Sequence, residues 1–407
     1  MPVRAVQKEW EAVSIRDRLR VVRKFRRAIA GAASRLVDLF SDTLERTRAD
    51  SLTSEIIPLA EACRFLELEA ETILAARHLL KRGRPFWLRG VEIEVRHEPL
   101  GVVLIIGPSN YPLFLPGVQM LQGLVAGNAV LVKPGRGGLP VMKALSRLAT
   151  GSGLPSGLLT VLDEGVDSAT EAIRGGVDKI VVTGSLESGR AVLKEAAEQA
   201  TPVIAELSGC DPVFVLESAD ISKAVAAITF GCKLNGGATC IAPQRVFVHE
   251  AVAARLRAEL TTPIPVVNFS TDGEALHLAA HSPFALGASV FGEAVRARAF
   301  AKNVSAGVVV INDMIVPTAD PRMPFGGRRG SGFGKTRGAE GLLEMTTSKA
   351  VVVQRAKRLR HLEPASSNAE QFFLAYLSAS HAHGFKNRWK GWRHLGKALS
   401  QVRRDHA

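Results

Sequence analysis

Hydrophobic and polar residues follow two different periods along the chain. In residues 5–78 apolar side chains recur every three or four positions, as at Leu19, Val22 and Phe25, while Arg and Glu occupy the other face. This spacing predicts amphipathic helices. Residues 91–97 alternate instead from one position to the next, so they predict a strand or one arm of a hairpin.

From residue 101 onward, short apolar runs alternate with helix-like stretches. The runs that predict strands are 101–106, 129–132, 158–162, 179–182, 202–206 and 212–216. The stretches that predict helices are 140–150, 188–199 and 221–234. Strands that are apolar on both faces and separated by helices are typical of a parallel, doubly wound sheet, which binds ligands at the carboxyl ends of its strands.

A second strand–helix region covers residues 265–312. The Gly-rich segment 324–334 and a last β-like run at 350–353 follow it. With 407 residues, of which 46% are hydrophobic and 22% charged, the chain predicts a globular protein of two or three packed units.

The cysteines are few and scattered. Cys63, Cys210, Cys232 and Cys240 form no CxxC pair and no spacing typical of a metal site. We therefore expect no disulfide framework, no metal and a reducing cytoplasm as the location. No run of 18 apolar residues predicts a transmembrane helix, and residues 1–20 lack the compact apolar block of a secretion signal.

The net charge of +13 is concentrated near the end of the chain. Residues 354–407 contain eleven Lys and Arg against three acids, so this tail carries +8 and leaves +5 for the rest. Interleaved with these charges are the apolar residues Phe372, Phe373, Leu374, Tyr376, Leu377, Trp389 and Trp392. The mixture fits either a segment lying on an anionic membrane surface or a helix pair packed on the body or a neighbouring subunit. No nucleic-acid-binding module is present, so a nucleic acid partner is not expected.

Two residues at the ends of predicted elements could carry covalent and acid–base chemistry. Cys240 ends the run Asn-Gly-Gly-Ala-Thr-Cys just after the predicted helix 221–234, where small neighbours leave room for a thiolate nucleophile. The alternative is a packing cysteine in a Gly-rich loop. Glu206 ends the predicted strand 202–206, where a carboxylate could activate water; the alternative is a solvated acid at a strand end.

Further candidates follow other strands of the same predicted sheet. Asn110, in Gly-Pro-Ser-Asn, could donate its side-chain amide to an oxyanion, although the same sequence also suits a turn. Gly184, Ser185 and Gly189 join a strand to a helix start that could bind a pyrophosphate, but their spacing is not GxGxxG. Lys133 adds a cation at the same edge, or is an ordinary surface lysine.

Seven phrases in a fixed order carry a resemblance that the single motifs do not. They are Glu98-Pro-Leu-Gly-Val-Val, Pro108-Ser-Asn-Tyr-Pro, Ala126-Gly-Asn-Ala-Val-Leu-Val-Lys-Pro, Thr183-Gly-Ser, Glu206-Leu-Ser-Gly, Gly237-Ala-Thr-Cys-Ile-Ala-Pro, and Met323-Pro-Phe-Gly-Gly with Ser331-Gly. From about residue 9 to 354 the chain resembles the aldehyde dehydrogenase superfamily. These sequence motifs are most similar to those of the branch that acts on fatty and aromatic aldehydes, whose members also carry C-terminal extensions.

The resemblance implies an α/β fold with a doubly wound, Rossmann-type cofactor domain, a smaller α/β catalytic domain and an oligomerisation strand region. The implied parts are N-terminal helices with a hairpin arm (1–100), the NAD(P)-binding domain (101–207), a shortened catalytic domain (208–335), a C-terminal return and oligomerisation strand (336–353) and the basic tail (354–407). A homodimer or homotetramer is expected.

The resemblance also implies a role for each candidate. Cys240 would attack the aldehyde to form a thiohemiacetal and then a thioester, Asn110 and the Cys240 backbone N–H would stabilise the oxyanion, and Glu206 would activate the hydrolytic water. Lys133, Ser185, Gly184 and Gly189 would hold NAD or NADP. The product would be a carboxylic acid.

Two departures from the family pattern change these expectations. Arg136 stands where the family commonly has a ribose-binding glutamate, and it favours NADP unless its side chain points to solvent. Between Cys240 and Asn312 the chain is short and lacks the family's Glu-(Ile)-Phe-Gly-Pro phrase. The alternative to an active dehydrogenase is therefore an impaired, scaffold-like member or partner subunit.

Overall fold

The computed structural model describes residues 3–40, 44, 46–85, 88, 90–356, 359–362 and 367–405, without the side chains of Arg360 and residues 402–405. It divides into two compact units. The larger comprises Met1–Arg77 with Val95–Ala350, and the smaller comprises His78–Glu94 with Val351–Ala407.

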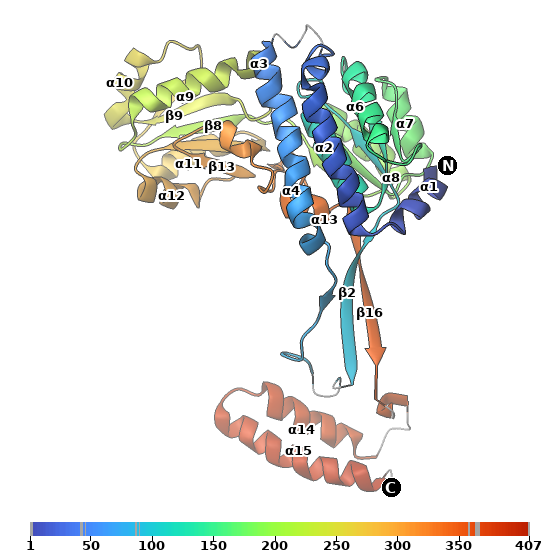
Figure 1. Ribbon diagram of the computed structural model, residues 1–407. Helices are drawn as coiled ribbons and strands as arrows, with labels where there is room; N and C mark the ends of the chain where they lie inside the picture. The colour runs from blue at the N-terminus through green and yellow to red at the C-terminus, as the bar shows by residue number, and fades with distance from the viewer. Residues whose placement is uncertain are drawn as a thin grey trace. The chain divides into compact units, whose positions relative to one another are not determined.

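The larger unit begins with helices, as the three-to-four spacing predicts. They are α1 (Val3–Glu11), α2 (Ile15–Val37), α3 (Arg48–Ser51), the π-helical turn η2 (Leu52–Ile56) and α4 (Ile57–Ile73). The α2 helix starts at Ser14, whose side chain accepts the N–H of Asp17, and it buries Leu19, Val22 and Phe25 on one face. It packs against α4, and the two run side by side in Figure 1. The helical pattern ends at Ile73, before the predicted limit of 78.

The first sheet has six strands in the order β15-β7-β6-β3-β4-β5. They are β3 (Val102–Ile106), β4 (Ala129–Lys133), β5 (Leu159–Val161), β6 (Lys179–Thr183), β7 (Val203–Glu206) and β15 (Gly332–Phe333). The first five are parallel, and β15 is antiparallel to β7. Each predicted strand of this sheet is confirmed to within two residues at either end.

Four helices alternate with these strands. They are α5 (Phe114–Ala126), α6 (Leu139–Gly151), α7 (Val166–Arg174) and α8 (Leu186–Glu198). The α6 and α8 helices agree with the predicted ranges. The sequence did not predict α5, because all of its residues are buried and it has no polar face.

The second sheet has five parallel strands in the order β10-β9-β8-β12-β13. They are β8 (Asp211–Val215), β9 (Pro243–His249), β10 (Val266–Phe269), β12 (Gly287–Phe291) and β13 (Val308–Ile311). Their helices are α9 (Ile221–Lys233), α10 (Glu250–Glu259), α11 (Asp272–Ala280) and α12 (Ala294–Ala301). Val213 and Val215 pack into one apolar cluster and Phe214 into another, so this sheet is covered on both faces.

The Gly-rich segment returns the chain to the first sheet. Its strand β14 (Arg328–Arg329) pairs with β11 (Phe284–Ala285), and β15 then pairs with β7. Gly332 lies in β15 with φ +99°, and a Cβ there would come within 1.9 Å of the Ala205 carbonyl oxygen. Glycine is therefore required for this pairing. The η5 turn (Val316–Ala319) precedes the segment, and α13 (Gly338–Leu343) follows it.

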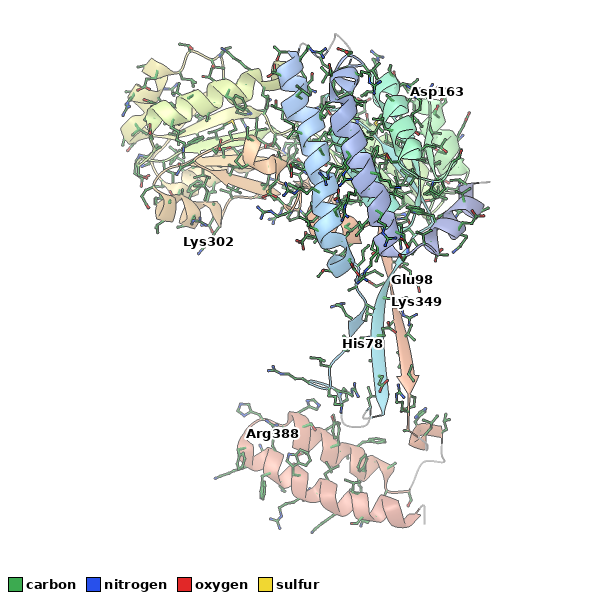
Figure 2. All side chains as sticks on the ribbon, viewed as in Figure 1. His78, Glu98, Asp163, Lys302, Lys349 and Arg388 are labelled. Atoms are coloured by element: carbon green, nitrogen blue, oxygen red, sulfur yellow. The ribbon has the colours of Figure 1, made fainter. Side chains whose placement is uncertain are left out.

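A three-stranded sheet in the order β1-β2-β16 continues from the larger unit into the smaller one. Its strands are β1 (Arg77–His78), β2 (Val91–Pro99) and β16 (Thr346–Gln354), which confirms both predicted arms. Lys349 Nζ of β16 lies 3.0 Å from Glu98 Oε1 of β2 (Figure 2). In this order β16 is an edge strand.

The smaller unit ends in a helical hairpin, α14 (Ala369–His381) and α15 (Phe385–Asp405), preceded by the short η6 (Arg360–Leu362). Small residues let the two helices approach each other, since a Cβ on Gly391 would come within 2.3 Å of the Ala379 backbone nitrogen. Ala375, Ala379 and Leu395 are buried between them. Within the described residues, no helix is both long and apolar enough to cross a bilayer.

Candidate active site

Cys240 lies in a loop of unusual backbone conformation between α9 and β9. The α9 helix ends at Lys233, and Asn235, Gly236 and Gly237 all have positive φ angles of 57°, 60° and 79°. Glycine and asparagine adopt this conformation at little cost, which explains the Asn-Gly-Gly sequence. Cys240, three residues after Gly237, is partly exposed. We refer to residues 235–240 as the 235–240 loop.

Cys240 and Glu206 line the same cavity, which has a volume of about 210 Å³. Glu206 comes from the carboxyl end of β7 in the first sheet, whereas Cys240 precedes β9 in the second. The remaining lining is largely apolar and includes Tyr111, Phe114, Leu115, Phe230, Val316 and Phe325. The structure thus brings the two predicted reactive residues into the lining of one largely apolar pocket.

Glu206 is almost completely buried, with 1% of its surface exposed. Its Oε2 accepts a hydrogen bond of 2.7 Å from Thr336 Oγ1, while its Oε1 has no partner among the described residues. Burial raises the pKa of Glu206, and the Thr336 hydroxyl and the nearby Arg337 charge counteract the shift. The alternative of a solvated acid at a strand end is therefore wrong.

The thiol of Cys240 has a pKa well above its ordinary value. Burial is the main cause, and the charges of Glu206 and Asp211 add to it, whereas Arg337 opposes it. The loop therefore lacks the net positive surroundings that would favour a thiolate in the free protein.

Arg337 and Asp211 border this site but were not among the predicted residues. Arg337 is buried, donates from Nη1 to the Thr318 carbonyl at 2.6 Å and stacks 4.3 Å above the Phe325 ring. Asp211, the first residue of β8, accepts the Gly287 N–H, and burial raises its pKa to about 7. A single charged residue in a loop or at a strand start has no periodic signal, so sequence patterns could not single out either one.

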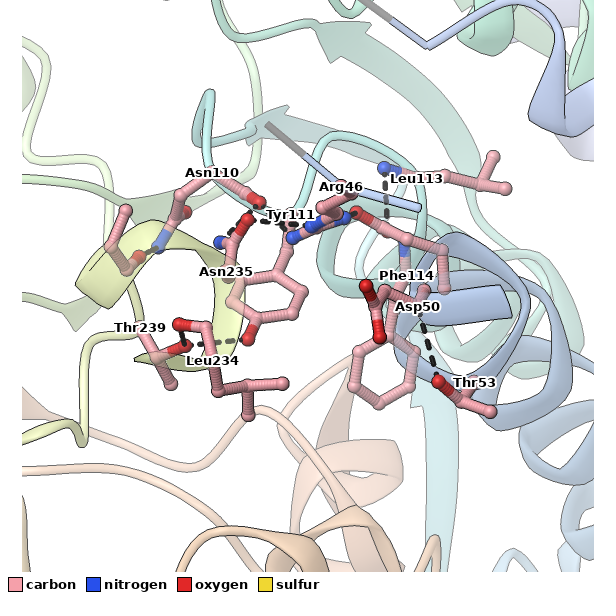
Figure 3. A network of polar contacts seen from close by, with 12 residues as sticks. Arg46, Asp50, Thr53, Asn110, Tyr111, Leu113, Phe114, Leu234, Asn235 and Thr239 are labelled. Atoms are coloured by element: carbon pink, nitrogen blue, oxygen red, sulfur yellow. Dashed lines mark hydrogen bonds and ion pairs between the residues drawn. The ribbon is translucent and has the colours of Figure 1, made fainter. Parts of the chain in front are cut away.

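Asn110 lies in the loop after β3 and reaches the 235–240 loop. Its side-chain Nδ2 donates to the Ala238 backbone carbonyl at 2.6 Å, and the backbone carbonyl of Asn110 accepts from Asn235 Nδ2 at 3.1 Å. Figure 3 shows these contacts within a larger polar network that also contains Arg46 and Tyr111. The predicted oxyanion donor therefore lies beside the backbone that leads to Cys240.

The predicted cofactor residues lie at the carboxyl ends of two strands that flank β3. Lys133 ends β4 and is half-buried, and this burial lowers its pKa while the Glu164 carboxylate counteracts the shift. Gly184 and Ser185 follow β6, and Ser185 Oγ caps α8 by accepting the Ser188 N–H at 3.0 Å.

These surroundings fit the pyrophosphate of a dinucleotide. A Cβ on Gly189 would come within 2.5 Å of the Leu207 side chain, so glycine lets α8 approach the end of β7 closely. A Cβ on Gly184 would meet only Ser188, at 3.6 Å, so the backbone at the helix start is open. An accessible helix N-terminus attracts phosphate, and the Lys133 ammonium adds positive charge two strands away at the same edge of the sheet.

The side chain of Arg136 is exposed in the loop after β4, so it is accessible to solvent and to a phosphate group alike. The carboxylate of Glu164 reaches this loop and accepts the N–H groups of Gly137 at 3.0 Å and Leu139 at 2.8 Å. Glu164 follows β5, and its side chain reaches the start of α6. The sequence alone did not identify this residue.

Comparison with protein families identifies the fold and its chemistry. The family model described as "Aldehyde dehydrogenase family" matches residues 3–264 and 257–351. The chain belongs to the aldehyde dehydrogenase family. The resemblance stated from the sequence is thus confirmed, and the protein is an oxidoreductase that acts on aldehydes.

Two relatives of this aldehyde dehydrogenase align with most of its length. It is 27% identical over 446 aligned positions to the 4,4'-diapolycopene aldehyde oxidase of a Methylomonas species, covering 90% of this chain and 84% of the relative. It is 24% identical over 421 positions to the 4,4'-diaponeurosporen-aldehyde dehydrogenase of Staphylococcus aureus, covering 84% and 91%.

A solved structure shares the fold. The substrate-bound Staphylococcus aureus AldH superposes with a TM-score of 0.83 at 22% identity, covering 92% of this chain and 98% of that one. The α/β aldehyde dehydrogenase fold is therefore confirmed.

Proposed function

We propose that this aldehyde dehydrogenase oxidises an apolar aldehyde to a carboxylic acid with NAD or NADP, using Cys240 as nucleophile and Glu206 as base. The observation that carries the proposal is the shared cavity of Cys240 and Glu206, because a nucleophile and a base must reach the same carbon. The stretch between Cys240 and Asn312 is shorter than in the family pattern, but the second sheet still forms with five strands.

The reaction begins with a bond between Cys240 Sγ and the aldehyde carbon, while the thiol proton passes to the Glu206 carboxylate. The resulting oxyanion lies near Asn110, whose Nδ2 has a second N–H beyond the one donated to Ala238. A nicotinamide coenzyme held by Lys133, Gly184, Ser185 and Gly189 would supply the hydride acceptor, and the carbon bound to Cys240 would then be a thioester. Glu206 releases its proton to solvent and then takes one from water, which hydrolyses the thioester to the acid.

Lys133, Gly184, Ser185 and Gly189 are the residues that would hold the coenzyme. The helix start of α8 would receive the pyrophosphate, and the Lys133 ammonium would meet the ribose. Arg136 supports NADP, because a guanidinium pairs well with a 2′-phosphate.

The substrate class is proposed from the pocket walls. Phe230 and Val316 line the cavity and are 45% and 57% exposed, so an apolar surface continues from the pocket to solvent. Burying an apolar chain along such walls is favourable, whereas a charged aldehyde would lose its hydration there. The names of the two relatives, which refer to 4,4'-diapolycopene aldehyde and 4,4'-diaponeurosporen-aldehyde, support the same class.

The test is coenzyme reduction with aldehydes of increasing chain length. We expect kcat/KM to rise with chain length, and Cys240→Ala to remove turnover while the protein still folds. Cys232→Ala is the matched control and should keep activity, because Cys232 lies outside the cavity lining. A Cys240→Ala variant with normal turnover would exclude this mechanism. An inactive but folded wild type would favour the scaffold alternative.

For assembly and location, we propose a homodimer or homotetramer joined through β16, in a cytoplasmic enzyme. The support is that β16 is the edge strand of its sheet and can add strands from another subunit. Light scattering of the wild type and of a variant with proline in β16 would test the assembly.

A peripheral membrane contact through α15 is proposed as well. Phe385, Trp389 and Trp392 follow the spacing of one helix face and are 81%, 59% and 56% exposed. Four basic residues with the same spacing lie one position further along and form an adjoining stripe: Lys386, Lys390, Arg393 and Lys397. Aromatic and basic stripes side by side suit the headgroup region of an anionic bilayer.

A further inference from the structure

The side chains of Arg46 and Glu55 form a buried ion pair. Arg46 Nη1 lies 2.6 Å from Glu55 Oε1, and their side chains are 2% and 0% exposed. Glu55 Oε2 also accepts the N–H groups of Leu113 at 3.2 Å and Phe114 at 2.6 Å, at the start of α5. Burial raises the pKa of Glu55, and Arg46 and these N–H groups counteract the shift. The carboxylate is thus fixed between a guanidinium and a helix N-terminus.

The remaining nitrogens of Arg46 reach both loops of the candidate active site. Nε donates to Asn235 Oδ1 at 2.5 Å, and Nη2 donates to the Asn110 carbonyl. The guanidinium carbon lies 4.6 Å from the centre of the Tyr111 ring (Figure 3). Since Asn235 Nδ2 donates to the same Asn110 carbonyl, one guanidinium joins the loop after β3 to the loop that carries Cys240.

These two loops are also joined directly before Cys240. Asn110 Nδ2 donates to the Ala238 carbonyl at 2.6 Å, and the Tyr111 hydroxyl shares a hydrogen bond of 2.7 Å with Thr239 Oγ1. Both residues that precede Cys240 are therefore held by the loop that Arg46 fixes.

We propose that Arg46 is a positioning residue for the nucleophile. It acts through Asn235 and Asn110 and sets where the Cys240 sulfur lies relative to the Asn110 amide. A guanidinium suits this task because its planar fork offers three nitrogens in fixed directions, whereas a lysine offers one point charge. Glu55 neutralises the charge and orients the fork.

The proposal rests on the proposed function for its kinetic readout, but a chemical readout is independent of turnover. The main variant is Arg46→Ala, and Arg48→Ala is the matched control, because Arg48 pairs with Asp38 on an exposed surface of the same region. We expect kcat to fall about 100-fold in Arg46→Ala, since a misplaced reacting group costs about that much. KM should change by much less, and millimolar guanidinium should restore part of kcat.

Alkylation by iodoacetamide gives the readout that does not require turnover. We expect Cys240 to react faster in Arg46→Ala, because a loosened loop exposes the thiol and removes the burial that raises its pKa. Cys63 is completely buried, so its continued protection shows that the variant is folded. A folded Arg46→Ala with the kcat and the Cys240 reactivity of the wild type would overturn the proposal.

A second pair of variants covers the case in which unpaired Glu55 prevents folding. Asn235→Gly suits the positive φ but removes both side-chain contacts, whereas Asn235→Asp keeps an acceptor for Arg46. We expect Asn235→Gly to lower kcat and speed Cys240 alkylation, and Asn235→Asp to lie closer to the wild type. Wild-type behaviour of Asn235→Gly would refute the role of Arg46. If the wild type oxidises no aldehyde, the proposed function fails, and the alkylation rates still decide this inference.

Discussion

The hydroxyl of Thr336 donates a hydrogen bond of 2.7 Å to Glu206 Oε2 and leaves Oε1 as the unpaired oxygen of a buried carboxylate. Thr336 follows β15, whereas Glu206 ends β7, so the pairing of these two strands brings the hydroxyl to the acid. One oxygen is thereby held in place while the other can accept a proton.

Replacing Thr336 with valine tests whether this hydrogen bond helps to keep Glu206 ionised. The hydrogen bond counteracts the raised pKa of Glu206, so its loss should raise that pKa further. The carboxylate must be ionised to act as a base, and the rise of kcat with pH should therefore move to higher pH. On the rising side of the pH profile we expect kcat at a given pH to fall by about tenfold, the effect of losing one hydrogen bond to a charged group. Thr170→Val, on the exposed side of α7, is the control in a kcat–pH profile.

The preference between NAD and NADP should depend on Arg136 and Glu164. Arg136→Glu should weaken NADP binding relative to NAD by about tenfold or more, because a charge-assisted contact is replaced by repulsion. Glu164→Gln should shift the ratio the other way, since it removes a negative charge beside the start of α6. Titrations of protein fluorescence with each coenzyme measure both ratios. Arg147→Glu makes the same charge change on the exposed side of α6, and an equal effect there would mean that Arg136 does not face the coenzyme.

Asp211 should make the protein less stable as the pH rises. Its folded pKa of about 7 lies above the ordinary value of 3.8, so the folded state binds more protons between these values. The free energy of unfolding therefore falls as pH increases through this window, by up to about 4 kcal/mol. In urea unfolding, the free energy of unfolding of Asp211→Asn should change less with pH between pH 4 and about pH 7 than that of the wild type. A slope identical to that of the wild type would show that Asp211 is already ionised.

The stripes of α15 predict binding to anionic vesicles. The wild type should sediment with phosphatidylserine-containing vesicles at low salt and much less at high salt, because screening weakens the basic stripe. Lys386→Glu with Lys390→Glu should abolish this binding, and Trp389→Ser with Trp392→Ser should weaken it at every salt concentration. Lys143→Glu with Lys302→Glu is the control in the larger unit, where both lysines are exposed. An absence of sedimentation in all conditions, with an altered oligomeric state in the tryptophan variant, would assign the stripe to a protein interface instead.

Strand–helix alternation predicted most of the first sheet, because buried parallel strands appear as continuous apolar runs. The same rule missed α5, which is apolar on all sides and therefore lacks a helical period. Cys240 and Glu206 were predicted as reactive residues because Cys240 follows a recognisable helix, Glu206 ends a recognisable strand, and each belongs to a family motif. Their meeting in one cavity depends on the packing of two sheets, which no local pattern encodes.

Arg46 and Glu55 illustrate the other limit of sequence reasoning. Both lie in a stretch whose helical period suggests solvent-facing charges, but the π-helical turn at Leu52–Ile56 and the connection before α3 bury them. A pairing between residues nine positions apart has no place in the three-to-four spacing of a regular helix. Their role could be inferred only from the three-dimensional contacts.

The raised pKa of Cys240 has a consequence for the survival of the enzyme. Peroxides and other oxidants attack the thiolate rather than the thiol, and a protonated sulfur in an apolar pocket presents little of the reactive form. With Cys240 as the proposed nucleophile, the protein without substrate would present mainly the unreactive thiol. The sulfur would become reactive only when its proton is removed within the pocket, and this would limit its oxidation between turnovers.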